Sequence, residues 1–216
     1  PHPIGVDGSG RHLYQAGIQP EGNVCIIGSG PVGMIYARLA HLEGAGRALM
    51  EVRSEYKREL VKAVLGDQVE VYLAPRSADD ASPETLAAED RIVRDLFDLT
   101  GGYLFDDVVA ASPSPAAQRL MLRLYTPEGY AVGACFGGTH KRVDAADLDT
   151  NHYRVAKTIG SSGCSTDCML TILDWLASRR LDLRGFVSKH RYTLDDDPHE
   201  FLTTDADGLK PALFMG

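Results

Sequence analysis

The chain has 216 residues, of which 44% are hydrophobic and 24% charged, so it can bury the core of one full α/β domain. Its 22 basic and 30 acidic residues give a formal net charge of −8, which argues against nucleic acid as a partner. The longest apolar runs fall far short of the roughly 20 residues that cross a bilayer. The first ten residues show no export signal. We therefore expect a soluble, cytoplasmic protein that binds neither nucleic acid nor a membrane.

Regular structure is expected from residue 23 onward, after a Gly- and Pro-rich entry segment at residues 1–22. Short apolar runs then alternate with longer stretches of helical periodicity. The predicted strands are 24–27, 48–52, 69–73, 107–111, 130–136, one near Thr158, 186–190 and 210–214. The predicted helices are 34–42, 54–65, 82–99, 114–125, 166–178 and a short one within 195–204. This alternation predicts an α/β fold with a doubly wound parallel sheet, because parallel neighbours need a crossover connection.

The turn after the first predicted strand reads Gly28-Ser29-Gly30-Pro31-Val32-Gly33 and leads directly into a predicted helix. In a dinucleotide-binding (Rossmann) turn, Gly28 would allow the tight bend and Gly30 would let the backbone approach a pyrophosphate. Gly33 would let the helix pack closely on the strand, and the helix N-terminus would face the phosphates. The alternative is a glycine-rich turn without a ligand. The strand before it and the helix after it favour nucleotide binding.

The second predicted strand ends in Glu51-Val52-Arg53, about 20 residues after the glycines. The dinucleotide fingerprint has an acidic residue at this place, which binds the adenosine ribose hydroxyls. Glu51 therefore favours NAD over NADP, because a carboxylate would repel a 2′-phosphate. Arg53 could soften this repulsion or lie over the adenine face. The alternative for Glu51 is an ordinary solvated charge at a strand end.

The rest of a cofactor wall should come from other strand ends, because ligands of open parallel sheets bind outside the carboxyl ends of the strands. Small residues that suit close approach to the nicotinamide and its ribose follow the fourth, fifth and sixth predicted strands. They are Ala111 and Ser112, Phe136 and Gly137, and Ser161 and Ser162. The alternative at each place is a short turn without a ligand.

Four cysteines, Cys25, Cys135, Cys164 and Cys168, are few for this length and are expected to be free thiols, mostly buried. Cys164 and Cys168 could form half of a metal site, but no second pair or histidine cluster completes it. We therefore predict no metal site in this chain.

A rival catalytic motif is Tyr153-x-x-x-Lys157, which matches the acid–base pair of the short-chain dehydrogenases. Those enzymes also have a Gly-x-x-x-Gly-x-Gly turn near the start of the chain and a serine about a dozen residues before the tyrosine. Residues 141–143 read Lys-Arg-Val instead. The alternative, that Tyr153 packs and Lys157 is solvated, is favoured, and no catalytic residue is assigned.

Several segments, taken in chain order, together match the sequence pattern of a known protein family. They are residues 16–20 (Ala-Gly-Ile-Gln-Pro) leading into 24–33, then 105–112, 123–129 and 185–194. Over residues 15–216 the chain resembles the cofactor-binding domain of the medium-chain, zinc-type alcohol and polyol dehydrogenases. Asn151-His152-Tyr153 before residues 158–163 is most similar to the sorbose-phosphate reductase branch.

The resemblance implies hydride transfer between NAD and an alcohol, polyol or ketone, in a homo-oligomer. It also implies an N-terminal catalytic domain that supplies cysteine, histidine and glutamate ligands to a catalytic zinc. These 216 residues lack that catalytic domain, so zinc is expected only if the catalytic domain is present in a longer enzyme. Residues 2–5 resemble the end of such a catalytic domain. The alternative is a stand-alone NAD-binding sensor without catalysis.

Three parts are expected along the chain. Residues 1–22 are the entry segment, and residues 23–165 form the dinucleotide-binding domain. Residues 166–216 complete the sheet or a dimer surface, and their last strands resemble those that return to the catalytic domain.

Overall fold

The computed structural model describes residues 18, 20–76, 78–126, 134–136, 157–159, 166–197, 199 and 209–213. Its elements in chain order are β1 (Asn23–Ile27), α2 (Pro31–Leu42), β2 (Arg47–Val52), α3 (Glu55–Leu65), η1 (Gly66–Gln68), β3 (Glu70–Leu73), α4 (Pro83–Leu99), β4 (Asp107–Ala110), α5 (Pro115–Arg123), β5 (Ala134–Phe136), β6 (Lys157–Ile159), α7 (Thr166–Ala177), η2 (Arg184–Phe186), β7 (Val187–Tyr192) and β8 (Lys210–Leu213).

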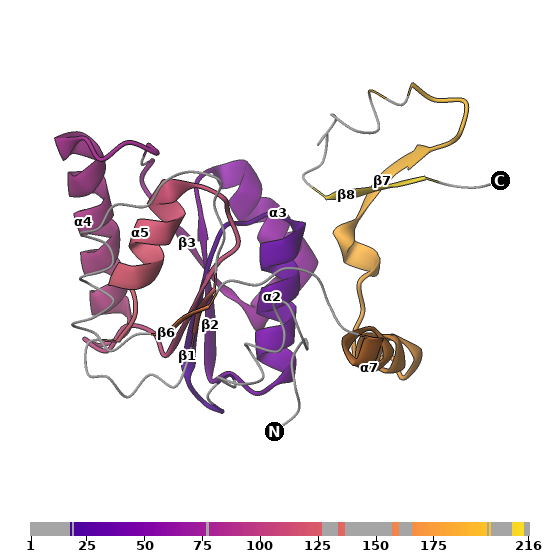
Figure 1. The fold of residues 1–216 in the computed structure, drawn as a ribbon, viewed down its shortest axis with the longest axis horizontal. Helices are drawn as coiled ribbons and strands as arrows, with labels where there is room; N and C mark the ends of the chain where they lie inside the picture. The colour runs from indigo at the N-terminus through magenta and orange to yellow at the C-terminus, as the bar shows by residue number, and fades with distance from the viewer. Residues whose placement is uncertain are drawn as a thin grey trace.

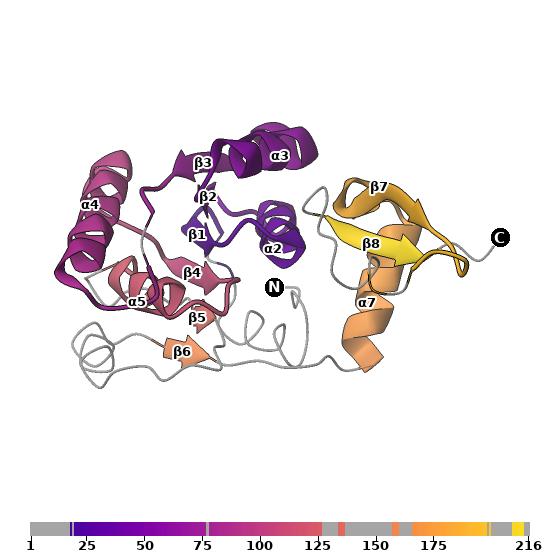
Figure 2. The same ribbon diagram turned by 90° about the horizontal axis from the view of Figure 1, so that it is seen from above.

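Six strands form one parallel sheet in the order β3-β2-β1-β4-β5-β6. Figures 1 and 2 show α2 and α3 on one face of this sheet and α4 and α5 on the other. The strand order reverses between β1 and β4, which is the switch point where open α/β sheets bind ligands. The predicted doubly wound Rossmann-type fold is confirmed.

Alternating side chains of the strands build two cores, one on each face of the sheet. Cys25 and Ile27 of β1 pack with Ile92 and Leu96 of α4 and with Leu120 of α5. On the other face, buried residues of β1 and β2 pack against α2 and α3. They are Val24, Ile26, Met50, Val52, Met34, Ala37 and Val61. Because both faces are apolar, the strands read as nearly continuous hydrophobic runs.

The C-terminal part rests on α2. Trp175 of α7 is 4% exposed and packs with Leu39 of α2 and with Leu181. Figure 2 shows α7, β7 and β8 beside α2. Strands β7 and β8 pair with each other in parallel, in a sheet separate from the six-stranded one. The proposed division of the chain at residues 22 and 165 stays a prediction.

Most boundaries lie within a residue or two of the predicted ones, and three of the differences have a clear physical cause. Helix α2 begins at Pro31 rather than residue 34, because proline at the first helical position lets the helix start inside the glycine turn. Helix α5 ends at Arg123, since Tyr125 leaves the helix to pair in parallel with Phe105. Phe186 lies in the 3-10 turn before β7 and packs with the α2/α3 core.

Residues 1–17 and 19 of the entry segment lie outside the described residues, as does most of the expected short helix within 195–204. No helix in the described part of the chain is both long and apolar enough to cross a membrane.

Candidate dinucleotide-binding site

The glycine turn between β1 and α2 has three glycines in three different environments. Gly28 has a φ of +111°, and a Cβ there would lie 3.0 Å from the carbonyl oxygen of Ala111. A Cβ at Gly33 would lie only 2.0 Å from the carbonyl oxygen of Gly28, so α2 packs directly on the turn. A Cβ at Gly30 would meet no atom of the described residues within 4 Å. Two of the glycines are thus required by packing, and Gly30 leaves open space over the backbone.

The N-terminus of α2 faces this open space without a capping side chain. Gly30 is its N-cap residue, no side chain bonds to the first turn, and that turn has no acidic residue. Ser54 and Ser82, by contrast, accept hydrogen bonds from backbone amides of α3 and α4. The first amides of α2 therefore have no partner within the described residues and, with the helix dipole, favour an anion.

The loop after β4 lies directly against the glycine turn. The amide of Ala111 donates to the carbonyl of Ile27 at 2.8 Å. The Cβ of Ser112 lies 3.3 Å from the position that a Cβ on Gly28 would take. The amide side chain of Gln118 donates to the carbonyl of Ser112 at 3.3 Å. The structure therefore brings Ala111 and Ser112 together with the glycines.

Glu51 stands near the end of β2, opposite Ile27 in β1 and Tyr72 in β3. It is only 2% exposed and forms an ion pair with the Nε of Arg53, whose side chain is 31% exposed. Its Oε1 accepts no hydrogen bond from any other described residue. Burial raises the pKa of Glu51, and the charge of Arg53 lowers it in part. Glu51 is thus a buried, partly satisfied acceptor rather than a solvated charge.

The raised pKa of Glu51 makes a pH-dependent contribution to stability. Since its pKa is higher in the folded than in the unfolded chain, the native state binds more protons, and the free energy of unfolding falls as pH rises through this window. We expect Glu51→Gln to gain stability relative to the unmodified protein as pH rises from about 4 to about 7. Urea denaturation at several pH values measures this gain. Glu55→Gln, a change at an exposed carboxylate of α3, is the control. If the difference in free energy of unfolding between Glu51→Gln and the unmodified protein did not change with pH, a raised pKa of Glu51 would be wrong.

The remaining predicted site residues divide into two groups. Ser29, Pro31, Val32 and Val52 belong to the same turn and strand end, and Val32 is 51% exposed beside the open glycine. Phe136 ends β5, next to Val109 of β4 and Ile159 of β6. Gly137, Ser161 and Ser162 lie outside the described residues, as does Tyr153 of the rival motif. Of the cysteines, Cys25 is confirmed as a buried free thiol.

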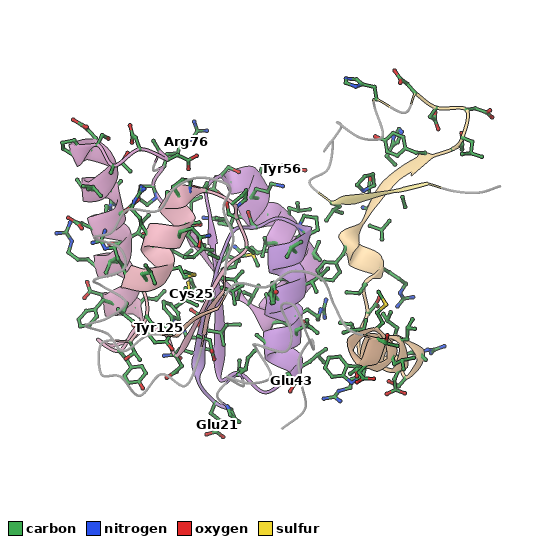
Figure 3. The ribbon with its side chains drawn as sticks, in the orientation of Figure 1. Glu21, Cys25, Glu43, Tyr56, Arg76 and Tyr125 are labelled. Atoms are coloured by element: carbon green, nitrogen blue, oxygen red, sulfur yellow. The ribbon has the colours of Figure 1, made fainter. Side chains whose placement is uncertain are left out.

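Sequence reasoning missed the loop between β3 and α4, at the same edge of the sheet. The guanidinium of Arg53 donates to the carbonyl of Pro75 at 3.2 Å, and Ser114 donates to Asp79 at 2.5 Å. Figure 3 labels Arg76 of this loop and Tyr56 of α3 on this edge, and Glu21 and Glu43 on the opposite one. The rule that ligands gather at carboxyl strand ends would have indicated the loop, but its sequence has no motif.

Two other possibilities for binding in this fold are a metal site and a hollow away from the glycine turn. In the described part of the chain, no group of three or more His, Cys, Asp or Glu residues is placed to hold a metal ion. The described residues therefore do not fit a catalytic zinc. An open hollow lies between the end of α7 and the start of β7, lined among others by Leu176, Leu181 and Leu183. None of the predicted site residues that the structure describes lines it.

No protein-family model and no curated protein sequence matches the chain. The fold is similar to that of solved dehydrogenases. With zinc-dependent alcohol dehydrogenase 2 from Streptococcus pneumoniae the TM-score is 0.66 at 21% identity, covering 84% of this chain and 47% of that one. Alcohol dehydrogenase TADH from Thermus sp. ATN1 gives 0.66 at 21% identity, with 94% and 55% covered.

Glucose dehydrogenase from Haloferax mediterranei, solved with NADP, Zn and gluconolactone, also gives a TM-score of 0.66, at 14% identity, with 95% and 55% covered. The chain thus spans about half the length of these structures. At these identities the likeness is one of fold. The described part of the chain therefore has a Rossmann-type fold, of the kind that also occurs in zinc-dependent alcohol and sugar dehydrogenases.

Proposed function

We propose that the chain binds NAD(H) at the carboxyl edge of β1, β2 and β4, as the nucleotide-binding part of an alcohol or polyol dehydrogenase. The observation that carries the proposal is the open face of Gly30 beside the uncapped N-terminus of α2. Gly28 and Gly33 are fixed by packing, whereas the packing of the described residues does not require a glycine at position 30. A pyrophosphate that approaches the backbone supplies the reason.

The residues present would divide the binding between them. The amides at the start of α2 would bind the pyrophosphate, and Glu51 would accept hydrogen bonds from the adenosine ribose. Its buried Oε1, which accepts no hydrogen bond apart from its contact with Arg53, supports this role. Ala111 and Ser112, beside the turn, would bound the crevice toward the nicotinamide half. When bound, NAD supplies the hydride acceptor for oxidation of an alcohol.

Glu51 also supports NAD over NADP, because a 2′-phosphate would meet a buried carboxylate. Arg53 reduces this preference, since its guanidinium neutralises Glu51 and is partly exposed at the same edge. We therefore expect a measurable but moderate preference for NADH over NADPH.

The proposal also covers the reaction of the complete enzyme and its substrate. By the resemblance of the sequence, the substrate is a small alcohol, polyol or ketone, and the protein acts as a homo-oligomer. The cytoplasm is the compartment expected from the composition and the first residues of the sequence. The zinc and its ligands would come from a further domain or partner, because the described residues hold no suitable cluster. The closer likeness to sorbose-phosphate reductases stays a prediction.

The first test is titration of the protein with NADH and with NADPH, followed by cofactor fluorescence and by calorimetry. We expect binding of both, with NADH tighter by about tenfold, which corresponds to about 1.4 kcal/mol. No binding of either cofactor at millimolar concentration would overturn the proposal, and tighter binding of NADPH would overturn the assigned role of Glu51. Oxidation of polyols by the intact native protein, followed by NADH formation, tests the enzymatic part.

A further inference from the structure

A buried ion pair joins α4 to α5 on the face of the sheet that carries Cys25 and Ile27. Glu89 of α4 is 0% exposed and Arg119 of α5 is 12% exposed. The guanidinium Nε lies 3.2 and 3.3 Å from the two carboxylate oxygens, and its terminal nitrogen NH2 donates to Oε1 at 2.6 Å. Arg123 lies 3.7 Å from the other oxygen, Oε2. The Glu89 carboxylate is therefore held in one orientation by guanidinium groups of α5.

The same guanidinium also binds the loop between β3 and α4 (residues 74–82, described except for residue 77). Arg119 donates to the backbone carbonyl of Asp79 at 3.3 Å and to that of Asp80 at 2.9 Å. The side chain of Asp80 accepts from Ser82 and Thr85, so this end of the loop is fixed on the first turn of α4. Arg119 therefore holds the loop by its backbone, independently of the side chains in it.

This loop connects the two ends of the candidate site. At one end, Pro75 accepts a hydrogen bond from Arg53, the partner of Glu51. At the other end, Asp79 accepts one from Ser114, two residues after Ser112. The loop thus joins the Glu51 end of the candidate site to its Ser112 end, and Arg119 bonds to its backbone.

Stability alone is a poor reason for this arrangement. Removing two charges from water costs free energy that their attraction returns only in part, so a buried ion pair is weak evidence for stability and an apolar pair is often as good. An apolar pair could join α4 to α5, but it could not bind the two loop carbonyls. The five-donor guanidinium supplies those bonds and the carboxylate contacts together.

We infer that Arg119 is a positioning residue. With Glu89 behind it, it anchors the Asp79–Asp80 end of the β3–α4 loop and thereby sets the other end of the loop, where Pro75 bonds to Arg53, on the adenosine side of the site. The inference rests on the proposed binding of NAD(H). Arg119 acts through the loop carbonyls and the Ser114–Asp79 contact, not by contact with the cofactor. Its loss should therefore affect recognition of the adenosine half and leave pyrophosphate recognition at the glycine turn unchanged.

The test is the double variant Glu89→Met/Arg119→Met, which removes both buried charges and leaves neither unpaired. Binding of AMP and of inorganic pyrophosphate is measured by calorimetry, alongside NADH. We expect AMP and NADH to bind about tenfold more weakly, with pyrophosphate within about twofold of the unmodified protein. Arg123→Met is the matched control, because this neighbouring arginine of α5 pairs with Glu89 and Asp90.

The possible outcomes separate the two ideas. If the unmodified protein binds neither NADH nor AMP, the proposed function and this inference fail together. If it binds them and the double variant binds AMP equally well, or loses AMP and pyrophosphate to the same extent, only the positioning role fails. If the double variant does not fold, Ser114→Ala decides, since it removes one loop tether without touching a buried charge. AMP binding about threefold weaker in Ser114→Ala supports the inference, and unchanged AMP binding overturns it.

Discussion

Replacing Gly30 with valine is expected to weaken NADH binding at least about 100-fold while the protein stays folded. The backbone of Gly30 has a φ of −78° and a ψ of 175°, which valine adopts readily. A Cβ there meets no atom of the described part of the chain within 4 Å, so the added methyl groups extend into the space assigned to the pyrophosphate. The loss of a favourable N-cap residue costs on the order of 1 kcal/mol.

The Gly30→Val experiment needs a folding measurement beside the binding one. Thermal unfolding by circular dichroism should show a small shift, and titration with NADH should show the large effect. Gly185→Ala is a control away from the site, because its Cβ would make an ordinary contact of 3.6 Å with Val64. Undiminished NADH binding in a folded Gly30→Val protein would remove the assignment of the turn.

Replacing Gly33 with alanine should mainly lower the stability of the fold, whereas Gly30→Val mainly weakens cofactor binding. The new Cβ would lie 2.0 Å from the carbonyl oxygen of Gly28, a backbone atom that cannot rotate away. Helix α2 must then move off β1, and we expect a loss of about 3 kcal/mol in the free energy of unfolding. For a chain of this length this corresponds to a fall in Tm of roughly 6–12 °C.

Denaturation with urea measures the loss directly, and Gly30→Ala serves as the matched control in the same turn. Gly30→Ala should lose only about 1 kcal/mol, the cost of a less favourable N-cap residue, because its Cβ has free space among the described residues. If Gly33→Ala proved as stable as Gly30→Ala, the close packing of α2 on the turn would be wrong.

Most of the fold could be predicted because local patterns and packing agree along the chain. Strand β1 is a short apolar run whose alternate residues face two helical layers, and serines begin α3 and α4. The predicted ends were less reliable where tertiary contacts decide them. Tyr125 continues the apolar periodicity of α5, yet its pairing with Phe105 ends the helix at Arg123.

The candidate site was only partly visible in the sequence. The glycine spacing and the distance to Glu51 are local patterns, and the geometry of the turn agrees with the predicted places of Gly28 and Gly33 in it. The burial of Glu51 and its pairing with Arg53 depend on β1 and β3, which lie on either side of it. The contact between Arg119 and the carbonyl of Asp79 spans 40 residues and uses a backbone atom, so no side-chain motif could indicate it.

Trp175, which packs the C-terminal part on α2, is the single tryptophan of the chain and therefore a spectroscopic reporter at that contact. Its indole lies under the guanidinium of Arg180, whose centre is 4.8 Å from the ring centroid. Its emission reports the docking of α7, whereas far-ultraviolet circular dichroism is dominated by the six-stranded sheet and its helices. An emission shift at a lower denaturant concentration than the loss of ellipticity would reveal a partly undocked native-like state. Coincident transitions would mean that the two parts of the molecule unfold as one cooperative unit.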